Sequence, residues 1–386
     1  MFFAVVAHSD DIDAQAALDE IIEQCRGELG ERTPKAGIVF CASDLEHDEI
    51  LEGILNAWPD LELIGCTTDG EISSVLGYRE DSVALVLFGS DTIEFAVGMG
   101  NDVSKDISSA CRVAVESAAA KSDLAPALCI TLPESLTASG LQIVESLVQQ
   151  LGSSVPVVGA GAGDGHRLVA TRQFCGREVG SDSVPVLLLS GPLVCSIALG
   201  SGWEPVGKPG LVTRSAGTLV EEIDGRPALE FYHRFLGETA EPTPEFPLAI
   251  LDENGGVKYL RACLGVFDSE TGTMTFVGEI PEGATVQMAV ANREEILVGC
   301  TASIERAFAG YPEEKMPDVA LFFSCASRKL LLGTRTMEEY GIIESIVGPD
   351  VPICGFYGYG EIGPRSSEGE TSRFHNETFV SVILGT

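Results

Sequence analysis

The chain has 386 residues, of which 24 are Lys or Arg and 58 are Asp or Glu, so its formal net charge is −34. A charge this negative repels phosphate backbones and anionic lipids, which argues against nucleic-acid binding through a basic surface and against a membrane-surface protein. Hydrophobic residues make up 45% of the chain, as in a folded globular protein, and at roughly 150 residues per domain the length predicts two or three domains.

The first residues and the cysteines indicate a cytoplasmic protein. Residues 1–7 are apolar, lack a basic region and run into His8, Ser9 and Asp10, which favours a first strand over a signal peptide. No stretch reaches the roughly 18 apolar residues of a membrane span. Eleven cysteines are scattered without a close pair, which is typical of reduced thiols rather than of disulfides or a metal site. We therefore expect a cytoplasmic chain without a membrane partner.

A pattern of strand, helix, strand, glycine-rich loop and strand occurs three times. In the first copy the strands are 36–43 and 61–64, the loop is 65–72, and the closing strand is 83–88. The corresponding strands and loops of the later copies are 127–131, 155–158, 159–165 and 184–189, then 319–323, 351–354, 355–362 and 379–384. Similar order in three places predicts internal repeats of one β-α-β-β module.

The segment between the second and third copies has a different pattern. It begins with a predicted strand over 192–203 and continues with a short helix over 228–236. Residues 248–300 then alternate as antiparallel strands do. We place the domain boundary so that the domains are 1–220 and 221–386. The predicted fold class is α/β in the broad sense, a mixed α+β fold of two halves in which helices cover mixed, largely antiparallel sheets.

The glycines of the three loops require either positive φ angles or the close approach of another group to the backbone. They are explained by tight turns alone, or by a shared cavity wall at the strand ends, where α/β proteins collect their ligand sites. The loop 159–165 does not meet the dinucleotide pattern Gly-x-Gly-x-x-Gly. Residues 168–171 are predicted as a strand rather than a helix, so no helix end faces a pyrophosphate.

Several motifs make the chain similar to the FIST sensory-domain family. The loop Gly-Cys-Thr-Thr-Asp-Gly-Glu-Ile at 65–72 resembles the amino-terminal half of that family. Residues 202–205, 212–213 and 223–228 resemble the segment that links this half to the next. Residues 280–283, 323–328 and 374–378 resemble the carboxy-terminal half, as does the most specific motif, Gly-Phe-Tyr-Gly-Tyr-Gly-Glu-Ile-Gly-Pro at 355–364. The resemblance spans nearly the whole chain, although Ser327 stands where a glycine is more usual.

The resemblance implies a ligand-sensing protein of signal transduction that binds a small molecule such as an amino acid and is not an enzyme. With no output domain in the sequence, it implies a partner in trans, such as a histidine kinase or another signalling protein. Some members of the family are similar to haem-binding nitric-oxide sensors, which makes haem an alternative cofactor.

We expect the ligand to lie between the glycine-rich loops. The candidate residues on one side are Cys325, Arg328, Gly355, Tyr357, Glu361, His375 and Asn376, those opposite are Cys66, Thr67, Asp69 and Glu71, and Arg261 is a further candidate.

Each charged candidate has a structural reading beside the functional one. Arg328 is a fork that clamps a ligand carboxylate, or it forms an internal salt bridge, for example to Glu361. Glu71 and Glu361 accept a ligand ammonium, or they hold their turns by accepting backbone N–H groups. Arg261 lies in what its neighbours suggest is an exposed strand face, which favours the structural reading.

The aromatic, histidine and thiol candidates also have both a functional and a structural interpretation. Tyr357 stacks on a ligand or covers its loop. His375 and His166 are haem ligands in the gas-sensor alternative, or hydrogen-bonded parts of the fold. Cys325 or Cys66 with His375 is the nucleophile and base of a third alternative, a cysteine-dependent hydrolase, although eleven scattered thiols favour a role in the core.

Overall fold

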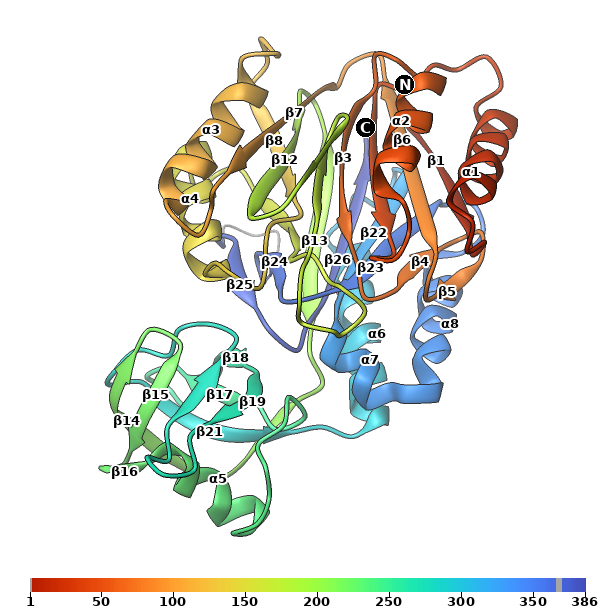
Figure 1. Cartoon of the computed structure of the whole chain (residues 1–386). Helices are drawn as coiled ribbons and strands as arrows, with labels where there is room; N and C mark the ends of the chain where they lie inside the picture. Colours follow the sequence, from red (N-terminus) through yellow and green to blue (C-terminus); the bar gives the residue numbers. More distant parts are fainter. Residues whose placement is uncertain (1, 366–369) are drawn as a thin grey trace.

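The computed structural model describes residues 2–365 and 370–386. Three six-stranded sheets and the helices around them form the body of the protein, and a smaller domain with its own sheet projects from one end (Figure 1). The fold is mixed α+β with mixed sheets, as the sequence predicts.

The first sheet has the strand order β1-β6-β2-β3-β10-β11. Its strands are β1 (Phe2–Ser9), β2 (Ala36–Cys41), β3 (Glu62–Thr67), β6 (Val83–Ser90), β10 (Gln173–Cys175) and β11 (Glu178–Gly180). The pair β2–β3 is parallel and the other pairs are antiparallel. The carboxyl ends of β2 and β3 therefore lie side by side at one edge.

The other two sheets are built in the same way, with the orders β7-β12-β8-β9-β24-β25 and β13-β26-β22-β23-β4-β5. Their strands are β7 (Glu94–Asn101), β8 (Pro126–Thr131), β9 (Val157–Ala160), β12 (Ser183–Ser190), β24 (Glu361–Gly363), β25 (Arg373–His375), and β13 (Val194–Gly200), β22 (Val319–Cys325), β23 (Ile353–Gly358), β26 (Phe379–Gly385), β4 (Glu71–Ser73), β5 (Gly77–Arg79). Each sheet ends in a short strand pair that comes from a different part of the chain. The three sheets are thereby joined in a ring.

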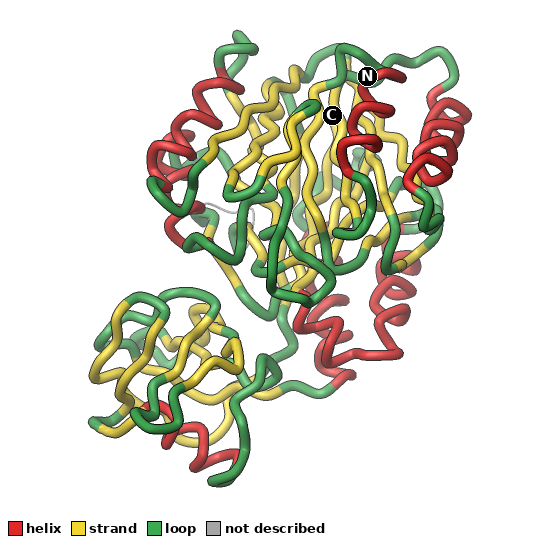
Figure 2. The backbone as a smooth tube through the Cα atoms, viewed as in Figure 1, coloured by secondary structure: helices red, strands yellow, loops and turns green. Residues whose placement is uncertain are grey.

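Alternate residues of the strands face two different cores. Phe40 and Val86 point into a core common to the three sheets, whereas Val39 and Leu85 face helices on the outside. Because both faces are buried, the strands read as continuous apolar runs in the sequence. Figure 2 shows the sheets inside and the helices around them. The outer helices are α1 (Ala14–Leu29) and α2 (His47–Ala57) on the first sheet, α3 (Ile107–Ala119) and α4 (Gly140–Leu151) on the second, and α6 (Arg293–Ala309) and α8 (Thr336–Val347) on the third.

Residues 204–290 form the small domain around a core of its own. Its elements are β14 (Glu204–Ala216), β15 (Leu219–Ile223), β16 (Arg226–Pro227), α5 (Ala228–Leu236), β17 (Leu248–Leu251), β18 (Val257–Arg261), β19 (Cys263–Phe267), β20 (Met274–Phe276) and β21 (Thr285–Val290). The strands around the predicted boundary at 220, β14 to β16, pair with one another in this one sheet. Where the two halves divide stays a prediction.

None of the helices within residues 2–365 and 370–386 is both long enough and apolar enough to cross a membrane.

Candidate functional site

The three glycine-rich loops meet at the carboxyl ends of the parallel strand pairs. Backbone hydrogen bonds of 2.8–2.9 Å close them into a ring, with Gly163 N donating to Thr67 O, Asp69 N to Tyr357 O, and Tyr359 N to Gly161 O. The loops that the sequence places far apart are therefore direct neighbours. Together they form a frame held by backbone hydrogen bonds.

Glycine is required where these loops cross. A Cβ atom on Gly163 would lie 2.9 Å from the backbone nitrogen of Asp69, and one on Gly358 would lie 2.5 Å from the carbonyl oxygen of Gly161. Both distances are shorter than real Cβ contacts. The glycines thus serve the close approach of backbone to backbone, and the group that approaches is another loop.

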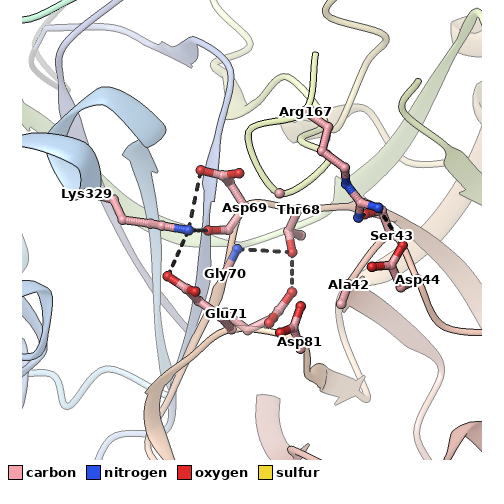
Figure 3. Close-up of a pocket in the computed structure, with 12 residues that line it drawn as sticks. Ala42, Ser43, Asp44, Thr68, Asp69, Gly70, Glu71, Asp81, Arg167 and Lys329 are labelled. Atoms are coloured by element: carbon pink, nitrogen blue, oxygen red, sulfur yellow. Dashed lines mark hydrogen bonds and ion pairs between the residues drawn. The ribbon is translucent and has the colours of Figure 1, made fainter. Parts of the chain in front are cut away.

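A cavity of about 330 Å³ opens beside the ring (Figure 3). It is lined by Ala42, Ser43, Asp44, Thr68, Asp69, Gly70, Glu71, Glu80, Asp81, Gly165, Arg167 and Lys329. Most of the lining comes from the loops that follow β2 and β3 and from β4. Two cations come from other parts of the chain: Arg167 follows the second glycine loop, and Lys329 lies in helix α7 (Ala326–Leu332). Asp69 and Glu71 are the predicted site residues that line this cavity.

Lys329 and Asp69 form the charged wall of the cavity. The Lys329 Nζ atom lies 2.6 Å from the backbone oxygen of Asp69, 3.5 Å from its Oδ2 atom and 3.0 Å from Oε1 of Glu80. The Asp69 side chain is fully buried, and its Oδ1 atom has no hydrogen-bond partner among the described residues. His166 Nδ1 lies 3.4 Å from Oδ2. The buried carboxylate of Asp69 therefore has an oxygen that can accept a further hydrogen bond, and it lies beside the ammonium group of Lys329.

Glu71 is held by a buried chain of hydrogen bonds. Its carboxylate accepts from the hydroxyl groups of Thr68 and Ser82. His8 extends the chain, with Nε2 lying 2.8 Å from Ser82 Oγ and Nδ1 2.7 Å from Ser73 Oγ. Burial raises the pKa of Glu71 to about 7 despite the hydrogen bonds from Ser82 and Thr68, and burial lowers the pKa of His8 to about 4. The cavity therefore contains a carboxyl group that exchanges its proton near neutral pH.

An acidic residue with a positive φ angle precedes the closing strand of each sheet. The angles are 51° for Asp81, 55° for Asp182 and 61° for Glu377, a region that such side chains rarely adopt. Asp81 lines the cavity, Asp182 accepts hydrogen bonds from Ser104 and Thr137, and Glu377 is fully buried. The acidic residues at these three equivalent positions thus have different surroundings, and the first of them, Asp81, lines the cavity.

Arg328 takes the structural one of its two predicted roles. Its guanidinium lies 2.6 Å from Glu339, both side chains are fully buried, and the Tyr357 hydroxyl donates to the same carboxylate at 2.6 Å. Glu361, named as the example of a salt-bridge partner, does not pair with it. Gly355 lies in β23, where a Cβ atom would lie 2.1 Å from the carbonyl oxygen of Phe322. The structure brings Arg328 and Tyr357 together, but as part of the core.

Glu361 and its neighbours form a separate buried cluster. Thr378 donates to Glu361 Oε2 from its backbone nitrogen at 3.1 Å and from its hydroxyl at 2.7 Å. Burial raises the pKa of Glu361 to about 8, and burial together with Glu361 raises that of Cys325. Asn376 accepts a hydrogen bond from Ala262 of the small domain at 3.4 Å. None of these residues lines the cavity.

Arg261 corrects an expectation, because it is not on an exposed face. It is 1% exposed and lies where the small domain contacts the body, donating to Phe374 O at 3.4 Å and to Glu279 O at 3.2 Å. Its guanidinium also lies 4.2 Å from the ring centre of Tyr259. The hydrogen bonds to these backbone oxygens and the contact with the Tyr259 ring compensate the Arg261 guanidinium for its loss of hydration.

His375, which the haem and hydrolase alternatives share, is buried. Its Nε2 atom lies 3.0 Å from Gly363 O and donates to it, so this nitrogen is engaged in the fold and is not free to bind a haem iron. Burial lowers the pKa of the ring to about 4. Cys66 and Cys325 are buried, and burial raises the pKa of both thiols, which disfavours a thiolate nucleophile. In the described ranges no group of three or more His, Cys, Asp or Glu side chains is placed to hold a metal.

Sequence reasoning missed most of the cavity lining. Lys329, Arg167, Asp81 and Ser43 line the cavity but were not among the predicted candidates. The one available signal was position, because Lys329 follows Arg328 and Arg167 follows the second glycine loop.

Comparison with protein families places two matches on the chain. A model described as the FIST N domain matches residues 35–226, and one described as the FIST C domain matches residues 228–364. The two matches meet at the start of α5 and leave the first sheet's β1 and α1 outside.

Several curated proteins are similar to this chain. An uncharacterized protein of Mycobacterium tuberculosis is 30% identical over 233 residues, which are 56% of this chain and 59% of that protein. The chain thus spans somewhat over half the length of that relative. An uncharacterized protein of Mycobacterium bovis is 25% identical over 91% of this chain and 92% of its own length. Another, of Methanocaldococcus jannaschii, is 23% identical over 90% of this chain and 73% of its own length.

Among solved structures, a cyanuric acid hydrolase from A. caulinodans aligns over 99% of both chains, with 8% identity and a TM-score of 0.38. A likeness at that level says nothing about activity.

Proposed function

Since the chain belongs to the FIST family, with both its N and C domains, we propose that it is a sensory protein that binds an amino acid or a similar small zwitterion beside Asp69. The domains of this family are associated with the sensing of small ligands in signal transduction. The observation that carries the proposal is the contact of Lys329 with Asp69 in the wall of a cavity of about 330 Å³. A cytoplasmic location and a signalling partner in trans, such as a histidine kinase, belong to the same proposal.

The chemistry of the cavity suits a zwitterion. An amino acid carries an ammonium group and a carboxylate on neighbouring atoms. Asp69, whose Oδ1 atom has no hydrogen-bond partner within residues 2–365 and 370–386, and Glu71 are acceptors for the ammonium. Lys329 is the cation that the carboxylate meets. The volume lies at the lower end of the roughly 300–1,000 Å³ typical of small-molecule sites, which favours a small ligand.

The negative net charge of the side chains that line the cavity favours a ligand that bears a positive charge. Five carboxylates line the cavity against the two cations Arg167 and Lys329. A purely anionic ligand is therefore repelled, whereas an ammonium group is attracted. The ring of loops holds these side chains in place before the ligand arrives, so little ordering is needed on binding.

A route for the output starts at the neighbour of Lys329. Arg328 donates to the backbone oxygens of Ser201 and Ile296, which lie on either side of the small domain at 204–290. One turn of α7 thus contacts the cavity through Lys329 and holds both connections to the small domain through Arg328. We propose that ligand binding favours one position of the small domain, and that the partner recognises this position.

Calorimetric titration of the full chain with the twenty amino acids tests the binding proposal. At least one amino acid should bind, and Asp69→Asn should weaken its affinity by about tenfold or more, because a charge-assisted hydrogen bond is lost. The matched control is Asp350→Asn, at an exposed residue outside the cavity, which should leave the affinity unchanged. Absence of binding by all twenty, or equal affinity in Asp69→Asn, would refute the proposal.

A further inference from the structure

A second cavity, of about 430 Å³, adjoins the first. It is lined by Ser43, Leu45, His47, Asp164, Arg167, Val169, Ala170 and Arg172. Ser43 and Arg167 line both cavities, so the two share a wall. The balance of charge differs sharply between them. Among the described residues, the first cavity has five carboxylates in its lining, whereas the second has one carboxylate and two arginines.

The single carboxylate of the second cavity is fully engaged. Asp164 Oδ1 accepts from the Tyr359 hydroxyl at 2.7 Å and from Leu168 N at 2.8 Å, and Oδ2 accepts from Val169 N at 2.7 Å and from Ala170 N at 3.0 Å. Burial raises the pKa of Asp164, but these hydrogen bonds outweigh it and hold the pKa below its ordinary value. Asp164 is therefore occupied as an acceptor and organises the loop.

The same hydrogen bonds correct the strand predicted over residues 168–171. The backbone N–H groups of Leu168, Val169 and Ala170 bond to a side chain and not to a neighbouring strand, so this segment is a loop. The loop leaves Val169 80% exposed at the cavity. Together with the buried Leu45, it supplies an apolar portion of the lining.

Arg172 is the cation of this cavity whose charge is not compensated. Its backbone is fixed, because Arg172 N donates to Thr67 Oγ1 at 2.9 Å and Thr67 N donates to Arg172 O at 2.9 Å. Its guanidinium makes no hydrogen bond or ion pair with any residue in 2–365 or 370–386. Arg167, by contrast, lies 2.7 Å from Asp44 Oδ1. In a chain with 58 acidic and 24 basic residues, an arginine left unpaired in a cavity is available to an anion.

His47 does not change this balance. Its Nε2 atom lies 3.0 Å from the backbone oxygen of Ala42 and donates to it, because a carbonyl oxygen only accepts. Burial lowers the pKa of His47, so its ring is neutral at pH 7.

We infer that the second cavity receives the side chain of the ligand, and that the ligand is an amino acid whose side chain ends in a carboxylate. This inference rests on the proposed function. The backbone ammonium and carboxylate groups of the ligand occupy the first cavity, its methylene groups pass Arg167 and lie against Leu45 and Val169, and its terminal carboxylate meets Arg172. The planar fork of a guanidinium binds a carboxylate through two parallel hydrogen bonds, which a neutral amide of the same shape does not replace.

Glutamate and glutamine make the sharpest pair of probes, because they differ in side-chain charge and hardly in shape. Titration calorimetry of the full chain should show that one acid binds about tenfold more tightly than its own amide. The pair is either glutamate and glutamine or aspartate and asparagine. In Arg172→Gln, the affinity for the acid should fall to within about threefold of that for the amide, and the affinity for the amide should not change. The matched control is Arg177→Gln at another exposed arginine, which donates to Asn56 away from both cavities and should keep the preference.

The outcomes separate this inference from the proposed function. If several amino acids bind and neither acid is preferred over its amide, the proposed function stands and the inference is wrong. If Arg172→Gln weakens acid and amide equally, Arg172 supports the fold of the loop and does not contact the side chain, which also overturns the inference. If none of the twenty amino acids binds, the proposed function fails and the inference fails with it.

Discussion

The Nζ atom of Lys329 donates to the backbone oxygen of Asp69 at 2.6 Å and so joins residues that are 260 positions apart. Asp69 lies in the region matched by the FIST N domain, and Lys329 lies in the region matched by the FIST C domain. The charged wall of the cavity thus exists only when both domains are folded together. We expect a ligand that bridges this contact to strengthen the attachment between them.

The first prediction concerns Lys329. Lys329→Gln removes the cation that meets the ligand carboxylate, so the affinity for the amino acid found in the screen should fall about tenfold or more. It also leaves the buried Asp69 charge without its ammonium partner, so the urea midpoint should decrease. Lys105→Gln is the control, because Lys105 forms an exposed ion pair with Asp102 and lies outside the cavity. Equal affinities of the two variants would contradict the role of Lys329.

The second prediction is a pH dependence of binding. The pKa of Glu71 is about 7 in the free protein, so at lower pH the carboxyl is neutral and attracts an ammonium weakly. A bound ammonium favours the ionised form, so binding releases a proton and the affinity should rise as the pH increases from 6 to 8. Calorimetry in buffers of different ionisation enthalpy measures the released proton directly. Glu71→Gln should flatten the dependence, and an unchanged profile in that variant would exclude Glu71 as its source.

The third prediction concerns the buried ion pair of Arg328 and Glu339. Glu339→Gln leaves the Arg328 guanidinium charged and buried without its carboxylate, which should lower the free energy of unfolding by about 3–5 kcal/mol. Denaturant unfolding measures this change. Glu338, which lies beside Glu339 in α8, forms an exposed ion pair with Arg335. Glu338→Gln removes that carboxylate and should have little effect on the free energy of unfolding. Similar losses in both variants would show that burial of the pair does not matter.

The fourth prediction concerns the ring of loops. Gly163→Ala places a Cβ atom 2.9 Å from the backbone of Asp69, so the loops must separate, and both stability and ligand affinity should decrease. Gly341→Ala is the matched control, because Gly341 lies in α8 and a Cβ atom added there would have no neighbouring atom within 4 Å. Alanine favours helix there, so unfolding should become harder by about 0.5–1 kcal/mol. Thermal unfolding of the two variants should shift in opposite directions.

The fifth prediction concerns Glu361 and the stability of the fold. Burial raises the pKa of Glu361 to about 8 from an ordinary value of 4.5, so between these values the folded protein keeps a proton that the unfolded chain releases. Its stabilising contribution is complete below pH 4.5 and is lost as the pH rises through about 8. Glu361→Gln lacks this titration. Its stability relative to the wild type should therefore improve from pH 5 to pH 9, and a constant difference would contradict the assignment.

Much of the fold could be predicted because its signals are local. Strands buried on both faces are continuous apolar runs, so β2, β8 and β22 stand out in the sequence together with the glycine-rich loops after their neighbours. Helices α1, α3 and α6 were not predicted, although each covers the outer face of a sheet. The placing of β4–β5 on β23 was not predictable, because a three-residue strand carries no mark of the sheet it joins.

For the site, the sequence by itself determined that residues 65–72 matter, and that Asp69 and Glu71 are charged groups on a loop that needs glycine. Only the tertiary structure decided which cations face them. Arg328 and Lys329 are adjacent in the sequence, yet helix geometry turns the first into the core against Glu339 and the second toward Asp69. One position along a helix changes the direction of a side chain by about 100°. Which direction meets the cavity depends on how the three sheets pack, and that packing arises from contacts between residues hundreds of positions apart.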